Sequence, residues 1–250
     1  MAGHSKWANI KRQKERVDAK RGAVFTKLSR DIIVAARSGL PDPSGNFQLR
    51  TAIDRAKAAG VPNENIERAI AKGSGAHSDS AALESIRYEG YGPGGVAVLV
   101  EAVTDNRNRT AADLRLAFSK NGGNLGETGC VSWMFSQKGV VSLSGACDEE
   151  KLLEDCAEVG AESYELTDEG AEVIGAIADL EAMATGLKGR GYAVRDAELR
   201  WIPGNSTPVE DADQGKSLLK LIDALEDLDD VQSVTSNFEM TDDLIVELSA

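Results

Sequence analysis

Apolar residues recur at three-, four- and seven-residue spacing through the first part of the chain, which is the pattern of amphipathic helices. The first predicted helix covers residues 17–38 and ends at Gly39. Its predicted inward positions are Val17, Val24, Leu28, Ile32 and Ala35. A second helix is predicted over 47–59, and a third, with Asn63 as its N-cap, ends at Gly73. Three helices joined by short loops predict a small helical domain, and residues 73–82 predict a linker.

After residue 82 the pattern changes to alternating strands and helices. Strands are predicted over 86–91 and 96–103, joined by a hairpin turn at 92–95. Residues 96–100 are apolar on both faces, which predicts a central strand covered on both sides. A helix over 107–121 and a strand over 131–135 follow.

From residue 139 the predicted order is strand 139–144, helix 149–159, strands 163–167 and 171–177, helix 179–188 and strand 193–202. This βαββαβ order is typical of a ferredoxin-like unit. A helix containing Leu218, Leu221, Ile222 and Leu225, and a strand over 231–238, remain at the end. One helix and one strand do not form a stable unit alone, so we expect them to return to the sheet begun at 86–135.

The predicted fold class is therefore α+β with three domains. Residues 1–75 form a basic three-helix domain that binds nucleic acid. Residues 83–137 and 207–250 form a discontinuous α+β domain, and residues 138–204 form a ferredoxin-like domain inserted into it.

Positive charge is concentrated at the start of a chain that is acidic as a whole. The 250 residues carry a net charge of −13, but residues 1–30 hold nine basic and two acidic side chains. Residues 1–75 have a net charge of +8, and the rest of the chain has −21. This asymmetry is typical of a polyanion-binding end joined to a body that repels polyanions.

The predicted nucleic-acid-binding residues lie in this basic segment: Lys6, Trp7, Lys11, Arg12, Lys14, Lys20, Arg21 and Lys27. Basic arms that order on nucleic acid gain affinity by neutralising phosphates and releasing counterions. Trp7 is a candidate for stacking on a base, which contributes about 1–3 kcal/mol. The alternative is that Trp7 and Ile10 fix the arm to the helical domain while the lysines face solvent.

A second candidate anion site lies at the start of the helix predicted over 107–121. It consists of Asn106, Arg107, Asn108 and Arg109. Arginines in a first helical turn face the positive end of the helix dipole, and a bound anion would reverse that unfavourable interaction. The alternative is that the arginines form ion pairs with Asp105, Asp113 or Glu101. Both remain open at the level of sequence.

Other functional classes find little support. Cys130, Cys147 and Cys156 form no CxxC pair, and His4 and His77 are the only histidines, so we predict no metal site. We also predict no catalytic residues, no cofactor and no small-molecule substrate. The longest strongly apolar stretch, residues 96–100, is far below the roughly 18–20 residues of a membrane span, so no membrane association is predicted. The acidic runs 148–150 and 226–230 are predicted to be solvated helix ends.

Several blocks of the sequence resemble the YebC/PmpR family. They are MAGHSKWANIK at 1–11, DAKRG at 18–22, FTKL at 25–28, IERAI at 66–70, YEGYGPGGV at 88–96, TDNRNRT at 104–110 and GGNLGE at 122–127. The resemblance spans the chain and is specific mainly over residues 1–135. Cys130 stands where a small residue is expected.

The resemblance implies a three-domain cytoplasmic protein with no known enzymatic activity. Bacterial members are described as probable transcriptional regulators that bind DNA. The related mitochondrial translational activator of cytochrome c oxidase, and bacterial relatives, imply instead a ribosome-associated factor that binds ribosomal RNA and assists elongation through difficult stretches, proline-rich ones among them. We therefore predict a DNA-binding regulator of gene expression, with the ribosome-bound translation factor as the alternative.

Overall fold

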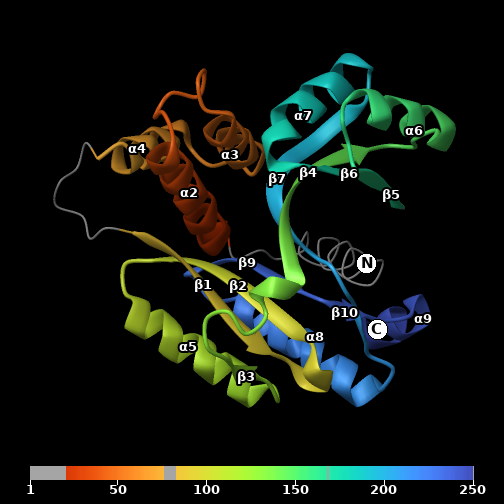
Figure 1. Cartoon of the computed structure of the whole chain (residues 1–250). Helices are drawn as coiled ribbons and strands as arrows, with labels where there is room; N and C mark the ends of the chain where they lie inside the picture. The colour runs from red at the N-terminus through yellow and green to blue at the C-terminus, as the bar shows by residue number, and fades with distance from the viewer. Residues whose placement is uncertain (1–20, 76–82, 168, 250) are drawn as a thin grey trace.

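The computed structural model describes residues 21–75, 83–167 and 169–249 (Figure 1). Helices α2 (Arg21–Ser38), α3 (Phe47–Ala58) and α4 (Asn63–Gly73) form the N-terminal bundle, which confirms the three predicted helices. The predicted start of the first helix lies outside the described residues. Where α4 crosses α2, a Cβ on Gly73 would lie 2.6 Å from the carbonyl oxygen of Ile33, so the close approach requires glycine.

Two details of the bundle differ from the sequence prediction. Pro62 is the N-cap of α4 and Asn63 is its first residue, since the fixed φ of proline suits the entry to a helix. Val24 is 41% exposed instead of buried, because the fully covered part of α2 begins at Ile32. The predicted inward positions Leu28, Ile32 and Ala35 are confirmed, Val24 is wrong, and Val17 lies outside the described residues.

The first sheet has the strand order β3-β1-β2-β9 and is antiparallel. Its strands are β1 (Glu84–Tyr91), β2 (Ala97–Thr104), β3 (Asn124–Leu125) and β9 (Val231–Ser236). Strand β2 is central, as its doubly apolar pattern predicted. The turn before it contains Gly94 and Gly95, both with φ of +75°. Strand β9 pairs with β2, so the end of the chain returns to this sheet as expected.

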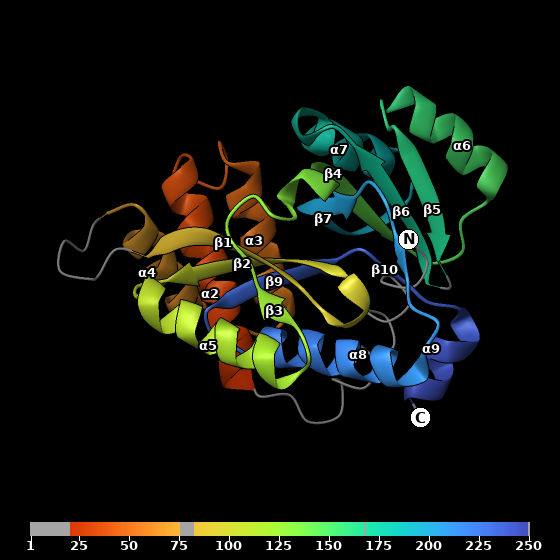
Figure 2. The ribbon, with the colours of Figure 1, turned by 60° about the horizontal axis from the view of Figure 1, so that its bottom comes forward.

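Helices α5 (Arg107–Lys120) and α8 (Ala212–Glu226) lie side by side on one face of the first sheet (Figure 2). The core between them and the sheet contains Leu114, Phe118, Leu218, Leu221 and Ile222, all of them buried.

The second sheet has the antiparallel order β5-β6-β4-β7. Its strands are β4 (Phe135–Ser144), β5 (Ser163–Thr167), β6 (Gly170–Gly175) and β7 (Ala193–Pro203), with α6 (Glu149–Glu158) and α7 (Leu180–Gly189) between them in the chain. This is the predicted ferredoxin-like βαββαβ arrangement. The strand predicted over 171–177 ends at Gly175, because a 3-10 turn at Ile177–Asp179 leads into α7.

The strand predicted over 131–135 is wrong. A 3-10 turn occupies Ser132–Met134, and Phe135 already begins β4. The reason is that the backbone N–H groups of Val131 and Ser132 donate to the side chain of Glu89 and are not available to a strand ladder. Strand pairing therefore starts one turn later than the sequence indicates.

The end of the chain contains more elements than predicted. The strand expected over 231–238 is divided into β9 and β10 (Phe238–Glu239), and β10 pairs in parallel with β8 (Thr207–Pro208). A helix, α9 (Asp242–Ser249), follows and buries Ile245 against the core of the first sheet. The three predicted domain boundaries stay a prediction.

The covered face of α5 provides a test of the first sheet's core. Leu114 is completely buried, whereas Leu116 on the same helix is 52% exposed. We expect Leu114→Ala to lower the free energy of unfolding by about 2–5 kcal/mol, because it leaves a cavity under the sheet. Leu116→Ala should change it by less than about 0.5 kcal/mol. Urea unfolding followed by circular dichroism measures both, and equal losses would contradict the described packing.

Candidate nucleic-acid interface

The structure describes only part of the predicted nucleic-acid-binding segment. Lys6, Trp7, Lys11, Arg12, Lys14 and Lys20 lie outside the described residues. Arg21 is the first residue of α2, and its side chain is not described. Lys27 lies one and a half turns further along α2, and its Nζ donates to the carbonyl oxygen of Glu226 at the C-terminal end of α8. A lysine is favourable there because the helix dipole places negative partial charge at that end.

Three arginines of the N-terminal bundle, Arg30, Arg50 and Arg55, form ion pairs with acidic residues of the two sheet units. Arg30 forms an ion pair with Asp230 at 3.0 Å, beside the first sheet. Arg55 forms ion pairs with Asp196 at 2.8 Å and Glu198 at 2.5 Å, both on β7 of the second sheet. The sequence assigns this positive charge to polyanion binding. In this conformation the arginines instead join the bundle to the two sheet units.

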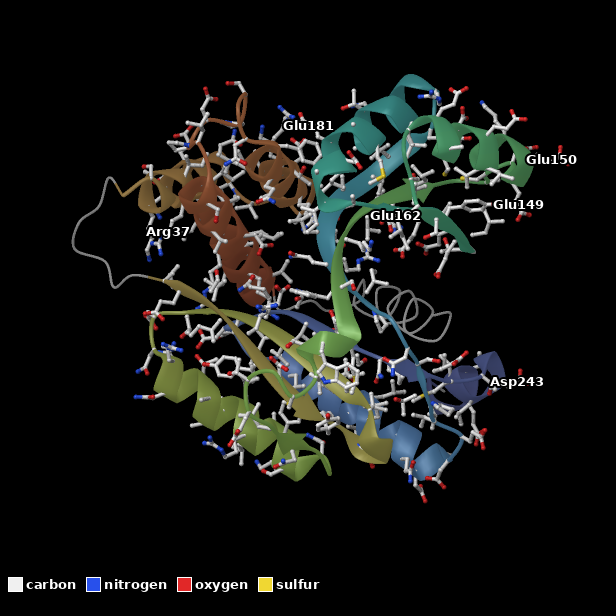
Figure 3. All side chains as sticks on the ribbon, in the orientation of Figure 1. Arg37, Glu149, Glu150, Glu162, Glu181 and Asp243 are labelled. Atoms are coloured by element: carbon white, nitrogen blue, oxygen red, sulfur yellow. The ribbon has the colours of Figure 1, made fainter. Side chains whose placement is uncertain are left out.

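A few cations of the bundle remain open to solvent. Among residues 21–75, Lys57 is exposed at the end of α3 and Lys72 is half-buried near the end of α4, and neither forms an ion pair with a described residue. Arg37 donates to the backbone carbonyl of Leu83 (Figure 3). The described bundle therefore offers only a small part of the positive charge that its sequence carries.

A cavity of about 590 Å³ lies where the bundle meets both sheets. Its wall includes Arg55 from α3, Glu101 from β2 and Trp201 from β7. The guanidinium of Arg87 stacks on the Trp201 ring at 4.9 Å, and the Trp201 indole donates to Glu101 at 3.0 Å. The cavity is thus lined by charged groups with partners, such as Arg55 and Glu101, and by the aromatic rings of Phe47 and Trp201.

Asp31 of α2 also lines this cavity. Burial raises the pKa of Asp31 to about 6, with a further rise from the charges of Glu198 and Glu101 and an opposing effect from Arg55 and Lys27. Burial dominates because a carboxylate loses its hydration there. The net charge of the cavity wall therefore changes near neutral pH.

At the second candidate anion site, both arginines have acidic partners, but of the partners named in the alternative interpretation only Asp105 is among them. Asn106 is the N-cap of α5, and its side chain accepts from the backbone N–H of Arg109 at 3.1 Å. Arg109 forms ion pairs with Asp105 at 2.9 Å and Asp230 at 3.0 Å, and Arg107 lies 3.7 Å from Glu84. Asn108 is exposed. Anion binding at this helix start stays a prediction.

Asp230 is a residue that sequence reasoning missed. It belongs to the acidic run 226–230, predicted to be solvated, yet it is buried and accepts hydrogen bonds from Thr110 at 2.7 Å and Thr104 at 3.1 Å. Burial raises the pKa of Asp230, but the hydrogen bonds from Thr110, Arg109 and Thr104 and the charge of Arg30 together lower it. No local pattern identifies it, because its partners come from α2, β2 and α5.

Glu89 is a second missed residue. It is only 3% exposed, and its carboxylate accepts from the backbone N–H groups of Gly129 at 2.8 Å, Val131 at 2.7 Å and Ser132 at 2.8 Å. Burial raises the pKa of Glu89, but these hydrogen bonds outweigh that effect and hold the pKa below its ordinary value. The glutamate thus fixes the loop before β4.

Trp133 projects from this loop and is 72% exposed. Its indole N–H donates to the carbonyl oxygen of Cys130 at 3.1 Å, and Tyr91 donates to the same oxygen at 3.0 Å. The ring is therefore held on the surface by a fixed loop.

Within residues 21–75, 83–167 and 169–249, no group of three or more His, Cys, Asp or Glu side chains is arranged to hold a metal ion. None of the helices in the described ranges has the length and apolar character that crossing a bilayer requires.

The fold and charge distribution define an α+β protein in which a basic helical bundle packs against two acidic sheet units. Two family models match it: the TACO1/YebC protein N-terminal domain over residues 5–76, and the TACO1/YebC second and third domain over residues 83–238. The chain belongs to the TACO1/YebC family, which confirms the resemblance of its sequence blocks.

Related proteins match along nearly the whole length. A probable transcriptional regulatory protein of Trichormus variabilis is 72% identical over 98% of both chains. One of Synechococcus elongatus is 64% identical over 100% of this chain and 99% of its own. The crystal structure of the conserved hypothetical protein Aq1575 from Aquifex aeolicus has 46% identity and a TM-score of 0.84, covering 90% of this chain and 93% of that one. The α+β fold is therefore shared with an experimental structure.

The role of Glu89 can be tested by Glu89→Gln. The variant places an NH₂ donor against backbone N–H donors, so we expect a loss of about 1–3 kcal/mol in the free energy of unfolding at neutral pH. Because the folded-state pKa of Glu89 is depressed, its contribution is complete above the unfolded pKa and is lost as pH falls through the folded pKa. Wild type and variant should therefore converge in acid.

Urea titrations between neutral and acidic pH measure this convergence. Glu127→Gln, an exposed position on the same loop, is the control and should change stability by less than about 0.5 kcal/mol. A constant difference between wild type and Glu89→Gln at every pH would contradict the assigned role.

Proposed function

We propose that this protein is a nucleic-acid-binding regulator of gene expression, and specifically a DNA-binding transcriptional regulator located in the cytoplasm. The observation that carries this proposal is the separation of charge, with +8 on residues 1–75 and −21 on the rest. The names of the bacterial relatives, probable transcriptional regulatory proteins, support it.

The separation of charge determines which end of the molecule contacts a polyanion. Phosphates attract the basic N-terminal segment through counterion release, while acidic sheets are repelled over about a Debye length of 8 Å. A polyanion then contacts one end of the molecule and leaves the sheets facing away. This is an arrangement for binding and regulation, so we propose that the protein acts without catalysis and without a cofactor.

A second candidate is a translation factor that binds ribosomal RNA and assists elongation through difficult stretches. The observation favouring it is that Arg55 of α3 faces β7, and Arg50 faces α7, so these two arginines of α3 are not presented to a DNA groove. Binding carried by a basic segment through phosphates needs no such groove-reading helix and suits RNA as well as DNA.

Neutralising the basic segment tests what both candidates share. In one variant, Lys6, Lys11, Arg12, Lys20 and Arg21 are all changed to Gln. We expect it to bind duplex DNA and RNA more weakly than the wild type does. On duplex DNA, the slope of log affinity against log salt should flatten by roughly 0.9 for each phosphate that the variant no longer neutralises. Fluorescence anisotropy titrations over a range of salt concentrations give both quantities.

The matched control removes five positive charges from exposed positions of the sheet units: Arg115, Lys120, Lys188, Lys216 and Lys220. It should leave the salt slope close to that of the wild type. If both variants flatten the slope equally, net charge and not the N-terminal segment determines binding.

Fractionation of a cell lysate separates the two candidates. For the transcriptional regulator we expect the protein to migrate apart from ribosomes and to be released from its complexes by DNase. Co-sedimentation with ribosomes and release by RNase would instead establish the translation factor, because the phosphates bound would then be those of ribosomal RNA.

A further inference from the structure

Helix α3 presents two arginines to the second sheet unit. Arg50 contacts Glu181 of α7 at 2.6 Å, and Arg55 contacts Asp196 and Glu198 of β7 at 2.8 and 2.5 Å. We name Arg50 and Arg55 the arginine face, and Glu181, Asp196 and Glu198 the carboxylate seat. Every contact between face and seat joins the N-terminal bundle to the second sheet unit.

The two β7 acceptors stand on one face of their strand, two residues apart, and both point at the same guanidinium. Arg55, Asp196 and Glu198 are 26–30% exposed, so this contact is half-buried and screened less than a surface pair. An arginine fork binds carboxylate and phosphate oxygens with the same geometry. The seat therefore occupies the donors that a phosphodiester would otherwise use.

The apolar contact beneath the ion pairs is thin. Phe47 of α3 packs against the core of the second sheet, with Arg50 stacked on its ring at 5.4 Å. Beside it lies the cavity of about 590 Å³, whose lining includes Thr51, Arg55 and Leu199. The bundle and the second sheet each have a core of their own, and separating them would remove Phe47 from the edge of the second one.

The other end of the bundle is held by different contacts. On α2, Lys27 donates to the carbonyl of Glu226 at the end of α8, and Arg30 forms an ion pair with Asp230 in the segment before β9. These contacts join α2 to the first sheet unit and do not involve the second sheet unit.

We propose that the arginine face is a second phosphate-binding surface, which the carboxylate seat covers until nucleic acid replaces it. This inference rests on the proposed function, because the same polyanion engages residues 1–30 and then the face. Internal carboxylates compete with phosphates, so the seat lowers basal affinity. A polymer already bound through the N-terminal segment presents further phosphates at high effective concentration and opens the contact.

The test uses the full chain with Asp196→Asn and Glu198→Gln, which removes the charge of the two β7 carboxylates of the seat but keeps their shape. Arg200 retains its pair with Glu172 at 2.9 Å, so the sheet is not left with an unpaired guanidinium. We expect this variant to bind a labelled single-stranded RNA and a labelled duplex DNA at least about fivefold more tightly than wild type, the lower end of typical coupling between sites. The salt slope should become steeper.

The matched control is Glu149→Gln with Glu150→Gln. These residues lie in the first turn of α6, on the side of the second sheet unit away from the bundle, and their loss changes net charge by the same amount (Figure 3). The control measures how much of any gain in affinity comes only from the weaker repulsion between a less acidic protein and the nucleic acid. Adding Arg55→Gln isolates the contact itself: it should abolish the gain in the Asp196→Asn, Glu198→Gln background and have little effect in the wild type.

The outcomes separate this inference from the proposed function. If wild type and all variants fail to bind RNA and DNA at low salt, the proposed function is wrong. If wild type binds but the seat variant binds no more tightly than the α6 control, the arginine face is not a phosphate-binding surface, and the proposed function stands. Should the double variant melt at a much lower temperature, the single variant Glu181→Gln gives the same comparison. Its side chain is 59% exposed, so a smaller gain in affinity is expected.

Discussion

The architecture depends on the pairing of β9 with β2. Val234 lies opposite Val100 in the centre of the first sheet, so a strand near the end of the chain completes a sheet begun near its middle. This pairing requires the second sheet unit to leave and return at one place, where Phe135 of β4 lies opposite Pro203 of β7. The backbone N–H of Gly204 then donates to the carbonyl of Met134 at 2.8 Å, which closes the base of that unit.

The same closure brings opposite charges together. Strands β4 and β7 run from the junction with the first sheet unit into the second sheet. The acidic face of β7 therefore lies against α3, and the loop before β9 lies against α2 (Figure 1). Positive charge that is useful for a polyanion is then neutralised by carboxylates at half-buried sites. Part of the charge that the sequence assigns to polyanion binding is, in the folded chain, paired with carboxylates of the sheet units.

Much of the fold was predictable from sequence, but the contacts of the candidate site were not. Periodicity predicted three helices, the central β2 and the βαββαβ order, because each depends on a local pattern of burial. No local sequence pattern identifies Glu89 or Asp230. Glu89 accepts hydrogen bonds from the backbone of a loop forty residues away, and Asp230 contacts residues from three elements. The same non-local hydrogen bonds are the reason why a strand predicted over 131–135 is a turn.

The sequence by itself determined where charge and apolar surface lie along the chain, and therefore the fold class, the family and the basic end. Tertiary structure alone decided which arginines face carboxylates and how Asp230 becomes buried between α2 and α5. The physical reason is that periodicity and composition are local properties. Ion pairing, burial of carboxylates and strand pairing depend on residues that meet only when distant segments have packed.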